Sequence, residues 1–303
     1  MERVIVVGAG VVGLSCAVRL LEAGHRVDVL ARELPLETTS AVAAAFWYPY
    51  LALPVERVTA WSAATFDELS RLAADPTTGV VMRDGTELLT ERSADPWWVS
   101  AVPALTRVTA PTGYAEAWSF VAPVVEMPVY LSWLSDRVVA LGGTITRMAL
   151  GALPAFAGVV VNASGLGARL LANDGSMTPV RGQVVLLEQV GLDRWWLDEG
   201  GPTYVIPRSR DIVVGGTDDA GDWDKTPDPA TTRRIVDDAT RLVPELAEAR
   251  VLGVRVGLRP VRPAVRLEAE EVDRTTVVHC YGHGGAGITL SWGCADDVVA
   301  LVS

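Results

Sequence analysis

Three glycines near the N-terminus have the spacing of a dinucleotide-binding turn. Gly8, Gly10 and Gly13 follow an apolar, β-branched run and precede an amphipathic segment. In such a turn the first glycine permits a tight bend, and the second lets the backbone approach a pyrophosphate. The third lets a helix and a strand pack closely, so the chemistry predicted here is phosphate binding.

Further candidate contacts to a nucleotide lie on either side of this turn. The N–H groups at Val11 and Val12 would begin a helix, whose partial positive charge suits a pyrophosphate. Glu33 follows the next apolar run, where an acid usually binds the ribose, and Arg32 would lie beside phosphate or adenine. An arginine here can also bind the 2′-phosphate of NADP, so the motif alone does not choose between FAD and NAD(P).

The elements that position these residues form one βαβ unit. Residues 3–7 predict a buried strand, and residues 12–22 have apolar positions at helical spacing. Gly24 would end the helix in a left-handed conformation, and residues 27–31 predict the next strand. A strand–turn–helix context of this kind makes the glycine motif far more specific than its letters alone.

The rest of the chain indicates two interleaved domains. Residues 51–150 are rich in tryptophan and proline and do not continue the alternation of strand and helix. Further predicted elements are strands at 158–165, 184–187, 212–216 and 275–280, and helices near 231–242 and from about Thr289 to Leu301. We predict an α/β fold, with a nucleotide-binding domain at 1–50, 145–185 and 250–303 and a substrate-binding domain at 51–144 and 186–249.

Composition excludes several classes of function. The 303 residues carry 26 Lys and Arg against 37 Asp and Glu, a net charge of −11, which argues against nucleic acid and anionic membrane partners. No stretch reaches the roughly 20 apolar residues of a membrane span. The apolar N-terminal run also has features of a signal peptide, but its glycines favour the nucleotide turn. Cys16, Cys280 and Cys294 show no paired spacing, so we expect no disulfide, no metal site and a reducing cytoplasm.

Later motifs resemble the D-amino acid oxidase family of flavoproteins along nearly the whole chain. The matching segments are VGAGVVGLSCA (7–17), ARELP (31–35), TTS (38–40), FWYPY (46–50), VNASG (161–165), VRGQ (180–183), YVIPR (204–208), GGT with GDW (215–223), GLRPVRPAVRLE (257–268) and YGHGGAGIT (281–289). The resemblance implies noncovalent FAD and an FAD-binding Rossmann-like domain interleaved with an α+β substrate domain that contains a large mixed sheet. The C-terminal Ala-Leu-Val-Ser differs from a peroxisomal signal, which favours a cytoplasmic, bacterial-type member.

The resemblance also assigns residues to the cofactor. Those expected near phosphate are Thr38, Thr39 and Ser40, and those expected along the FAD are Val161, Ser164 and Gly165. Those expected around the flavin ring, in one glycine-rich loop, are Gly282, Gly284, Gly285, Gly287, Ile288 and Thr289. Trp47 and Tyr50 would border the ring or pack in the core.

The expected substrate residues suit an amino acid. The guanidinium of Arg259 would hold the α-carboxylate in two parallel hydrogen bonds, and the Tyr204 hydroxyl would add a third. The carbonyl of Gly285 would accept the substrate amine. His283 could act as a general base, but we favour a loop that wraps the flavin with its backbone.

The implied reaction is hydride transfer from the substrate Cα to flavin N5. It gives an imino acid, then a 2-oxo acid and ammonia, while O₂ becomes hydrogen peroxide. Asp218 stands where D-aspartate oxidases carry an arginine, so neutral or basic D-amino acids should be favoured over acidic ones. The alternatives are a glycine or sarcosine oxidase, an NAD(P)-linked dehydrogenase and a noncatalytic flavin-binding protein. A homodimer is left open.

Overall fold

One mixed sheet of 14 strands runs through the protein, for which a computed structural model describes residues 2–50, 52–154 and 158–303. The strand order is β4-β5-β3-β9-β10-β11-β8-β13-β14-β7-β1-β2-β6, with β12 beside β8. The strands are β1 (Arg3–Val7), β2 (Arg26–Ala31), β3 (Val80–Leu89), β4 (Thr106–Val108), β5 (Glu116–Val125), β6 (Thr144–Arg147), β7 (Val159–Asn162), β8 (Thr178–Glu188), β9 (Trp195–Asp198), β10 (Tyr204–Pro207), β11 (Asp211–Gly215), β12 (Asp219–Ala220), β13 (Val251–Val272) and β14 (Thr275–His283). The α-helices are α1 (Val11–Glu22), α2 (Val55–Leu72), α3 (Met127–Ala140), α4 (Ala168–Leu171), α5 (Pro229–Leu242) and α6 (Gly287–Val302).

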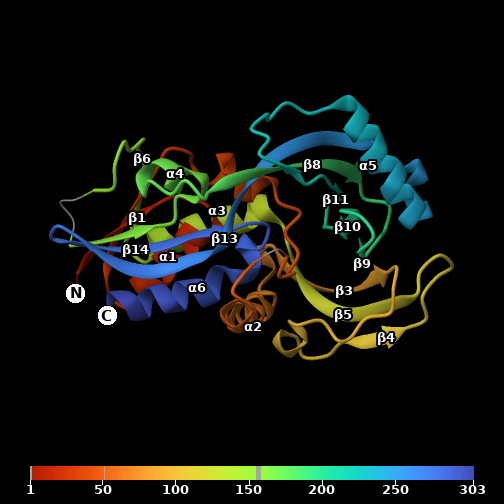
Figure 1. The fold of residues 1–303 in the computed structure, drawn as a ribbon, viewed down its shortest axis with the longest axis horizontal. Helices are drawn as coiled ribbons and strands as arrows, with labels where there is room; N and C mark the ends of the chain where they lie inside the picture. The colour runs from red at the N-terminus through yellow and green to blue at the C-terminus, as the bar shows by residue number, and fades with distance from the viewer. Residues whose placement is uncertain (1, 51, 155–157) are drawn as a thin grey trace.

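The nucleotide-binding half contains the parallel part of the sheet. Strands β6, β2, β1, β7 and β14 pair in parallel, with Val6 opposite both Val29 and Val161. These three valines are fully buried, as expected where both faces of a parallel sheet are covered. Helix α1 connects β1 to β2 and packs against α6, and both termini lie at this end of the molecule (Figure 1).

The strands of the other half are mainly antiparallel. The long strand β13 makes the sheet continuous between the two halves. The start of β13 pairs with β8, and its end pairs with β14. Beyond β8 the sheet continues through β11, β10 and β9, and α5 packs against β8 and β11. Strand β9 then pairs with β3, so that β3, β5 and β4 form a second arm opposite the first (Figure 1).

The predicted elements agree with this architecture except that β7 ends at Asn162, that β8 extends from Thr178 to Glu188, and that the C-terminal elements have other bounds. The βαβ unit is confirmed to within a residue at each boundary, and Gly24 has φ +88° as expected of a helix terminus. The predicted loop from Gly282 to Thr289 was wrong in extent. Strand β14 continues to His283, which pairs with Val261, and α6 already begins at Gly287.

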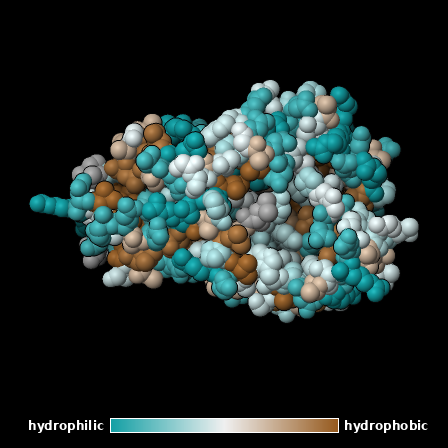
Figure 2. All heavy atoms as spheres, in the orientation of Figure 1, coloured by the Kyte–Doolittle hydropathy of each residue, from teal (hydrophilic) through white to brown (hydrophobic). Residues whose placement is uncertain are grey.

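Two further observations concern the domains and the surface. The proposed domain boundary between residues 185 and 186 falls inside β8. Strand β8 is part of the continuous sheet, so the chain does not leave the sheet at this boundary. Hydrophilic residues cover most of the face in Figure 2, with hydrophobic residues in small separate groups. Within the described parts of the chain, no helix has the length and apolar character needed to cross a membrane.

Candidate active site

A cavity of about 1150 Å³ extends between the two halves of the molecule. Its wall includes the β1–α1 turn, the ends of β2 and β7, the connection from β14 to α6, and residues of β3, β9, β10 and β13. Pockets for single small ligands measure roughly 300–1,000 Å³. The space therefore suits a dinucleotide together with a small substrate.

The glycine turn forms one end of this cavity. Gly8 has φ +117°, and a Cβ there would lie 2.4 Å from the carbonyl oxygen of Ala163. A Cβ on Gly13 would lie 2.0 Å from the Gly8 carbonyl oxygen, so α1 and β1 can only join this closely without side chains. Helix α1 then begins at Val11, and its N-terminus, with Gly10, faces the cavity.

The hydroxyls predicted to bind phosphate already have partners in the protein. Ser40 Oγ accepts a hydrogen bond of 3.0 Å from the Val11 N–H at the start of α1. Thr38 Oγ1 donates to the Pro35 carbonyl, and Thr39 Oγ1 donates to a carbonyl of β13. All three residues line the cavity, but the two threonines would contact a phosphate through backbone rather than hydroxyl groups.

The two residues predicted to contact the ribose and the neighbouring phosphate or adenine lie directly after β2. Arg32 and Glu33 both line the cavity and form an ion pair of 3.1 Å with each other. The Arg32 side chain is 74% exposed, which leaves its guanidinium free to turn towards a phosphate or an adenine. Glu33, predicted to contact the ribose, and Arg32, predicted to lie beside phosphate or adenine, thus both line the cavity at the end of β2.

The structure separates the remaining cofactor predictions into two groups. Those on the cavity wall are Val12, Ser164, Gly165, Gly284, Gly285, Gly287 and Ile288. Those behind the wall are Gly13, Val161, Gly282 and Thr289. Val161 is a core residue of β7, and Thr289 Oγ1 donates to the Tyr48 carbonyl at 2.9 Å and accepts from the Tyr48 N–H.

The aromatic residues predicted to border the flavin also differ from each other. Trp47 is fully buried in the core and donates to the carbonyl of Ser62. Tyr50 lies on the cavity wall, where its hydroxyl donates to an Asp218 carboxylate oxygen at 3.0 Å. Burial, together with that carboxylate, raises the pKa of Tyr50 to about 12.

The predicted substrate residues converge at one place on the wall. Arg259 of β13 donates through Nη1 to the Thr217 carbonyl at 2.8 Å, and its guanidinium lies over Gly182, where a Cβ would be 2.7 Å from Nη2. Tyr204 of β10 stacks over Gly215, where a Cβ would be 2.2 Å from the ring. Burial raises the pKa of Tyr204, and the neighbouring Arg259 guanidinium opposes this rise.

Gly285 and Asp218 complete this group. A Cβ on Gly285 would lie 2.9 Å from the Tyr50 ring and 3.6 Å from Arg259 Cδ. Asp218 Oδ1 lies 3.5 Å from Arg259 Nη1. Asp218 is an exposed residue that contacts both Tyr50 and Arg259. We call Arg259, Tyr204, Gly285, Tyr50 and Asp218 the carboxylate end of the cavity.

His283 lies on the wall but has the properties of a core residue. It is 3% exposed, and its Nε2 is 3.9 Å from the Cys280 sulfur. Burial lowers the pKa of His283 to about 4, so the ring is neutral over the physiological range. Cys280 and Cys294 are buried beside it, and the two sulfurs and a ring nitrogen of His283 lie within 4.8 Å of one another.

Tyr48 and Glu87 are among the wall residues that have no counterpart in the sequence predictions. The Tyr48 hydroxyl donates to Glu87 Oε1 at 2.6 Å, and both residues line the cavity. Glu87 is 2% exposed, and burial raises its pKa to about 7. In the sequence, Glu87 is an acid between Thr86 and the apolar pair Leu88 and Leu89, a pattern that does not indicate a contact with Tyr48.

Comparison with known proteins identifies the family. A family model described as FAD dependent oxidoreductase matches residues 3–301. The chain belongs to this family. It is 51% identical to a D-amino-acid oxidase of Rubrobacter xylanophilus, covering 99% of this chain and 96% of that protein. It is 43% identical to a D-amino-acid oxidase of Streptomyces coelicolor, covering 99% and 97%. The crystal structure of glycine oxidase from Geobacillus kaustophilus matches its fold with a TM-score of 0.85 at 20% identity, covering 100% of this chain and 95% of that one.

The cavity of this FAD-dependent oxidoreductase fits its cofactor. Gly8 and Gly10 line the cavity with backbone, where a Cβ would crowd the Ala163 carbonyl oxygen or Ser40 Oγ, and the N-terminus of α1 supplies N–H groups for a pyrophosphate. The N-terminus of α6, with Gly287 and Ile288 on the wall, supplies the same partial positive charge at the far side. The predicted α/β fold with a large mixed sheet and the FAD dependence are thus confirmed.

Proposed function

We propose that the protein is an FAD-dependent oxidase of D-amino acids. The observation that carries this proposal is the convergence of Arg259, Tyr204 and Gly285 at one end of a cavity whose other end is built for a dinucleotide. The two D-amino-acid oxidases named above support it. When bound, FAD accepts the hydride from the substrate Cα and passes both electrons to O₂, which gives hydrogen peroxide.

The carboxylate end would orient the substrate for this transfer. The guanidinium of Arg259 can donate two parallel hydrogen bonds to an α-carboxylate, and Tyr204 can donate a third from its hydroxyl. The Gly285 carbonyl would accept the amine, and the lack of a side chain keeps the space beside Tyr50 open. Three contacts fix which hydrogen of Cα points towards the cofactor, and this selects one enantiomer.

No protein acid or base is needed if the amine binds unprotonated. Loss of a hydride and of one amine proton converts the amine to an imine, and water then hydrolyses the imino acid to a 2-oxo acid and ammonia. His283 was the alternative as general base. Its burial and its packing against Cys280 favour a structural role instead.

Product analysis tests the proposal against its nearest rivals. With D-alanine or D-methionine, each O₂ consumed should give one hydrogen peroxide, one 2-oxo acid and one ammonia. A glycine or sarcosine oxidase would turn over those small amines with a higher kcat/KM than either D-amino acid. A noncatalytic flavin-binding protein would consume no O₂ with any of them.

The proposal extends to the charge of the substrate side chain. Asp218 lies beside the substrate carboxylate site, so a second carboxylate on the substrate would meet a like charge. Contact with Arg259 partly neutralises Asp218, and we therefore expect a moderate preference for neutral over acidic D-amino acids.

Asp218→Asn tests this preference without changing the shape of the side chain. The ratio of kcat/KM for D-aspartate to that for D-alanine should rise at least about fivefold, because roughly 1–4 kcal/mol of repulsion is removed at about 4 Å. Steady-state peroxide formation measures both substrates. A wild-type enzyme that prefers D-aspartate would refute the role given to Asp218.

A further inference from the structure

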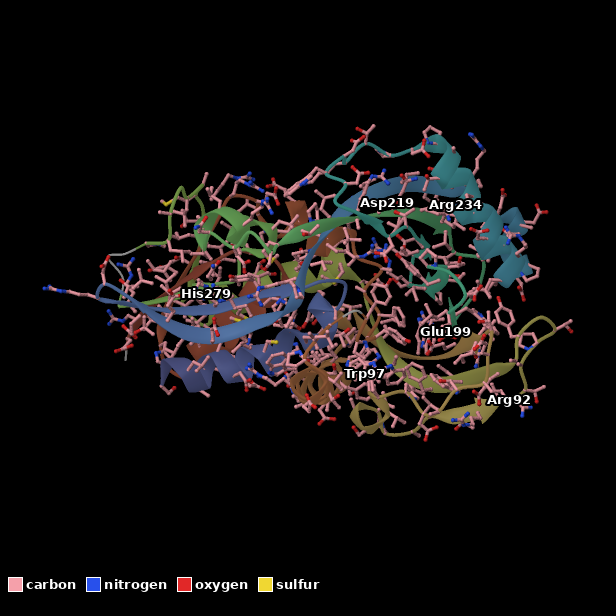
Figure 3. The ribbon with its side chains drawn as sticks, in the orientation of Figure 1. Arg92, Trp97, Glu199, Asp219, Arg234 and His279 are labelled. Atoms are coloured by element: carbon pink, nitrogen blue, oxygen red, sulfur yellow. The ribbon has the colours of Figure 1, made fainter. Side chains whose placement is uncertain are left out.

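One part of the cavity wall, separate from both the glycine turn and Arg259, is acidic. The wall there is formed by β3, β9 and the turn that follows β9, and its charged residues among those described are Glu87, Asp198 and Glu199. Glu199 lies between the β9 end and the β3 arm (Figure 3). We call these three residues the acidic wall.

Glu87 is the residue in this wall whose bonding is incomplete. Its Oε1 accepts from the Tyr48 hydroxyl, while its Oε2 is buried and has no hydrogen-bond partner among the described residues. A buried carboxylate oxygen without a donor is unfavourable, and an N–H donor at that oxygen would remove the penalty. Tyr48 is only partly buried, so its own oxygen can also accept from a ligand in the cavity.

The sheet register places Glu87 opposite the carboxylate end. Leu197 of β9 pairs with Glu87 on one side and with Tyr204 on the other. Directly paired residues extend their side chains from the same face of a sheet, and two interstrand spacings amount to about 10 Å. A ligand held at Tyr204 and Arg259 can therefore run along Leu197 towards Glu87.

A basic amino acid has the length to make this connection. The α-carboxyl carbon and the terminal nitrogen of lysine are six bonds apart, an extended span of roughly 7 Å. Hydrogen bonds of about 3 Å at each end extend the reach to roughly 13 Å, which is more than two interstrand spacings. The shorter side chains of alanine or aspartate end well before Glu87.

We propose that Glu87 and Tyr48 form a subsite for the cationic end of a long D-amino acid side chain, so that D-lysine and D-arginine are preferred substrates. The inference rests on the proposed oxidase function, and it adds a second charge-selecting site on β3 to the one proposed at Asp218. Glu199 and Asp198 add negative potential at the same part of the cavity wall, which favours an ammonium or guanidinium over a neutral group.

Matched substrates and one isosteric variant test this subsite. D-norleucine lacks only the ammonium of D-lysine, and D-citrulline is a neutral analogue of D-arginine. The wild type should show a higher kcat/KM for the cationic member of each pair. Glu87→Gln should lower these ratios about ten- to a hundredfold, with the neutral substrates changed little, because a charge-assisted hydrogen bond is lost.

Two further variants serve as controls. Glu91→Gln removes the same charge from an exposed position after β3 that does not line the cavity, and it should leave the ratios unchanged. Tyr48→Phe removes only the hydroxyl and should lower the ratios less than Glu87→Gln. It also provides the test if Glu87→Gln fails to fold. Equal kcat/KM for D-lysine and D-norleucine in the wild type, or unchanged ratios in both variants, would overturn the subsite.

Ligands that cannot be oxidised separate this inference from the proposed function. Binding of 6-aminohexanoate and of hexanoate to the holoenzyme can be followed through the flavin spectrum. The amino compound should bind at least about tenfold more tightly to the wild type, and this advantage should disappear in Glu87→Gln. Failure of every D-amino acid to react would refute the oxidase function, whereas equal binding of the two acids would refute the subsite alone.

Discussion

At the scale of single residues, the active site depends on how Arg259 is held. Its guanidinium lies over Gly182 and donates to the Thr217 carbonyl, so its position is fixed before any substrate arrives. Its side chain is 21% exposed, which leaves a largely desolvated charge facing the cavity. Such a preorganised group loses little freedom on binding a carboxylate.

Arg259→Ala should therefore lower kcat/KM by about one and a half to three and a half powers of ten, with FAD still bound. Removing one partner of a hydrogen-bonded charge pair costs roughly 2–5 kcal/mol. Arg259→Lys should retain only part of the wild-type kcat/KM, since an ammonium cannot donate two parallel hydrogen bonds to a carboxylate. Steady-state kinetics with D-alanine measures both variants, and near-normal kcat/KM in Arg259→Ala would remove this residue from the site.

At the scale of elements, two helix N-termini and the strand ends between them position the cofactor. The join of β1 and α1 allows no side chain at Gly13, because a Cβ would lie 2.0 Å from the Gly8 carbonyl oxygen. The atoms on both sides of this contact belong to the backbone, so no flexible side chain could move aside to make room for a methyl group at Gly13. The position of the α1 N-terminus relative to the cavity thus depends on one missing methyl group.

Gly13→Ala is expected to move α1 away from β1 and to weaken FAD binding. Overpacking of this kind costs typically 1–3 kcal/mol in the free energy of unfolding. Gly253→Ala is the matched control, because a Cβ there meets no atom within 4 Å. Thermal unfolding and the FAD retained after gel filtration compare the two variants, and equal values for both would contradict the proposed packing role.

Elements that are adjacent in the chain could be predicted from the sequence, and contacts between distant ones could not. The glycine motif, the α1 periodicity and the strand at residues 27–31 are local signals, and the structure agrees with them closely. The hydrogen bond between Tyr48 and Glu87 depends instead on pairing between segments that are far apart in the sequence. Phe46 bridges to Val124 of β5, which pairs with β3, and this brings Tyr48 beside a strand 39 residues away.

The cysteines illustrate the same limit. Their wide spacing in the sequence indicates no metal or disulfide site, yet Cys280 of β14 and Cys294 of α6 come together with His283 in the core. The hydrogen bond with Cys280, together with burial, raises the pKa of the Cys16 thiol. The hydrogen bond with Cys16 lowers the pKa of Cys280, but the hydrogen bond with Cys294 and burial outweigh it, and burial raises the pKa of Cys294 against the opposing hydrogen bond with Cys280. The three cysteines are therefore neutral thiols at neutral pH. The pattern of residues along the chain does not indicate that these cysteines lie close together in the fold.

At the scale of the whole molecule, the continuous sheet buries ionisable groups whose titration affects stability. His283 has a pKa near 6.5 when unfolded and about 4 when folded, because burial disfavours its charged form. Between pH 4 and pH 6.5, the His283 ring is therefore protonated in the unfolded chain and neutral in the folded protein. The associated stability is fully present above pH 6.5 and is lost as the pH falls towards 4.

The difference between the two pKa values corresponds to about 3 kcal/mol of unfolding free energy. Chemical denaturation of the wild type should show this loss across that pH range, in addition to the effect of other groups. His283→Asn should show a shallower decline over the same range, whatever its stability at neutral pH. Parallel curves for the two proteins would contradict a buried neutral His283.

The central claim is that the cavity presents the α-hydrogen of a D-amino acid to FAD. Anaerobic mixing of the yellow holoenzyme with D-methionine and, separately, with L-methionine tests it most directly, since loss of the oxidised-flavin absorbance reports hydride transfer without O₂. We predict complete bleaching by the D-enantiomer and none by the L-enantiomer. Bleaching by L-methionine alone, or by neither enantiomer of any amino acid, would contradict the account.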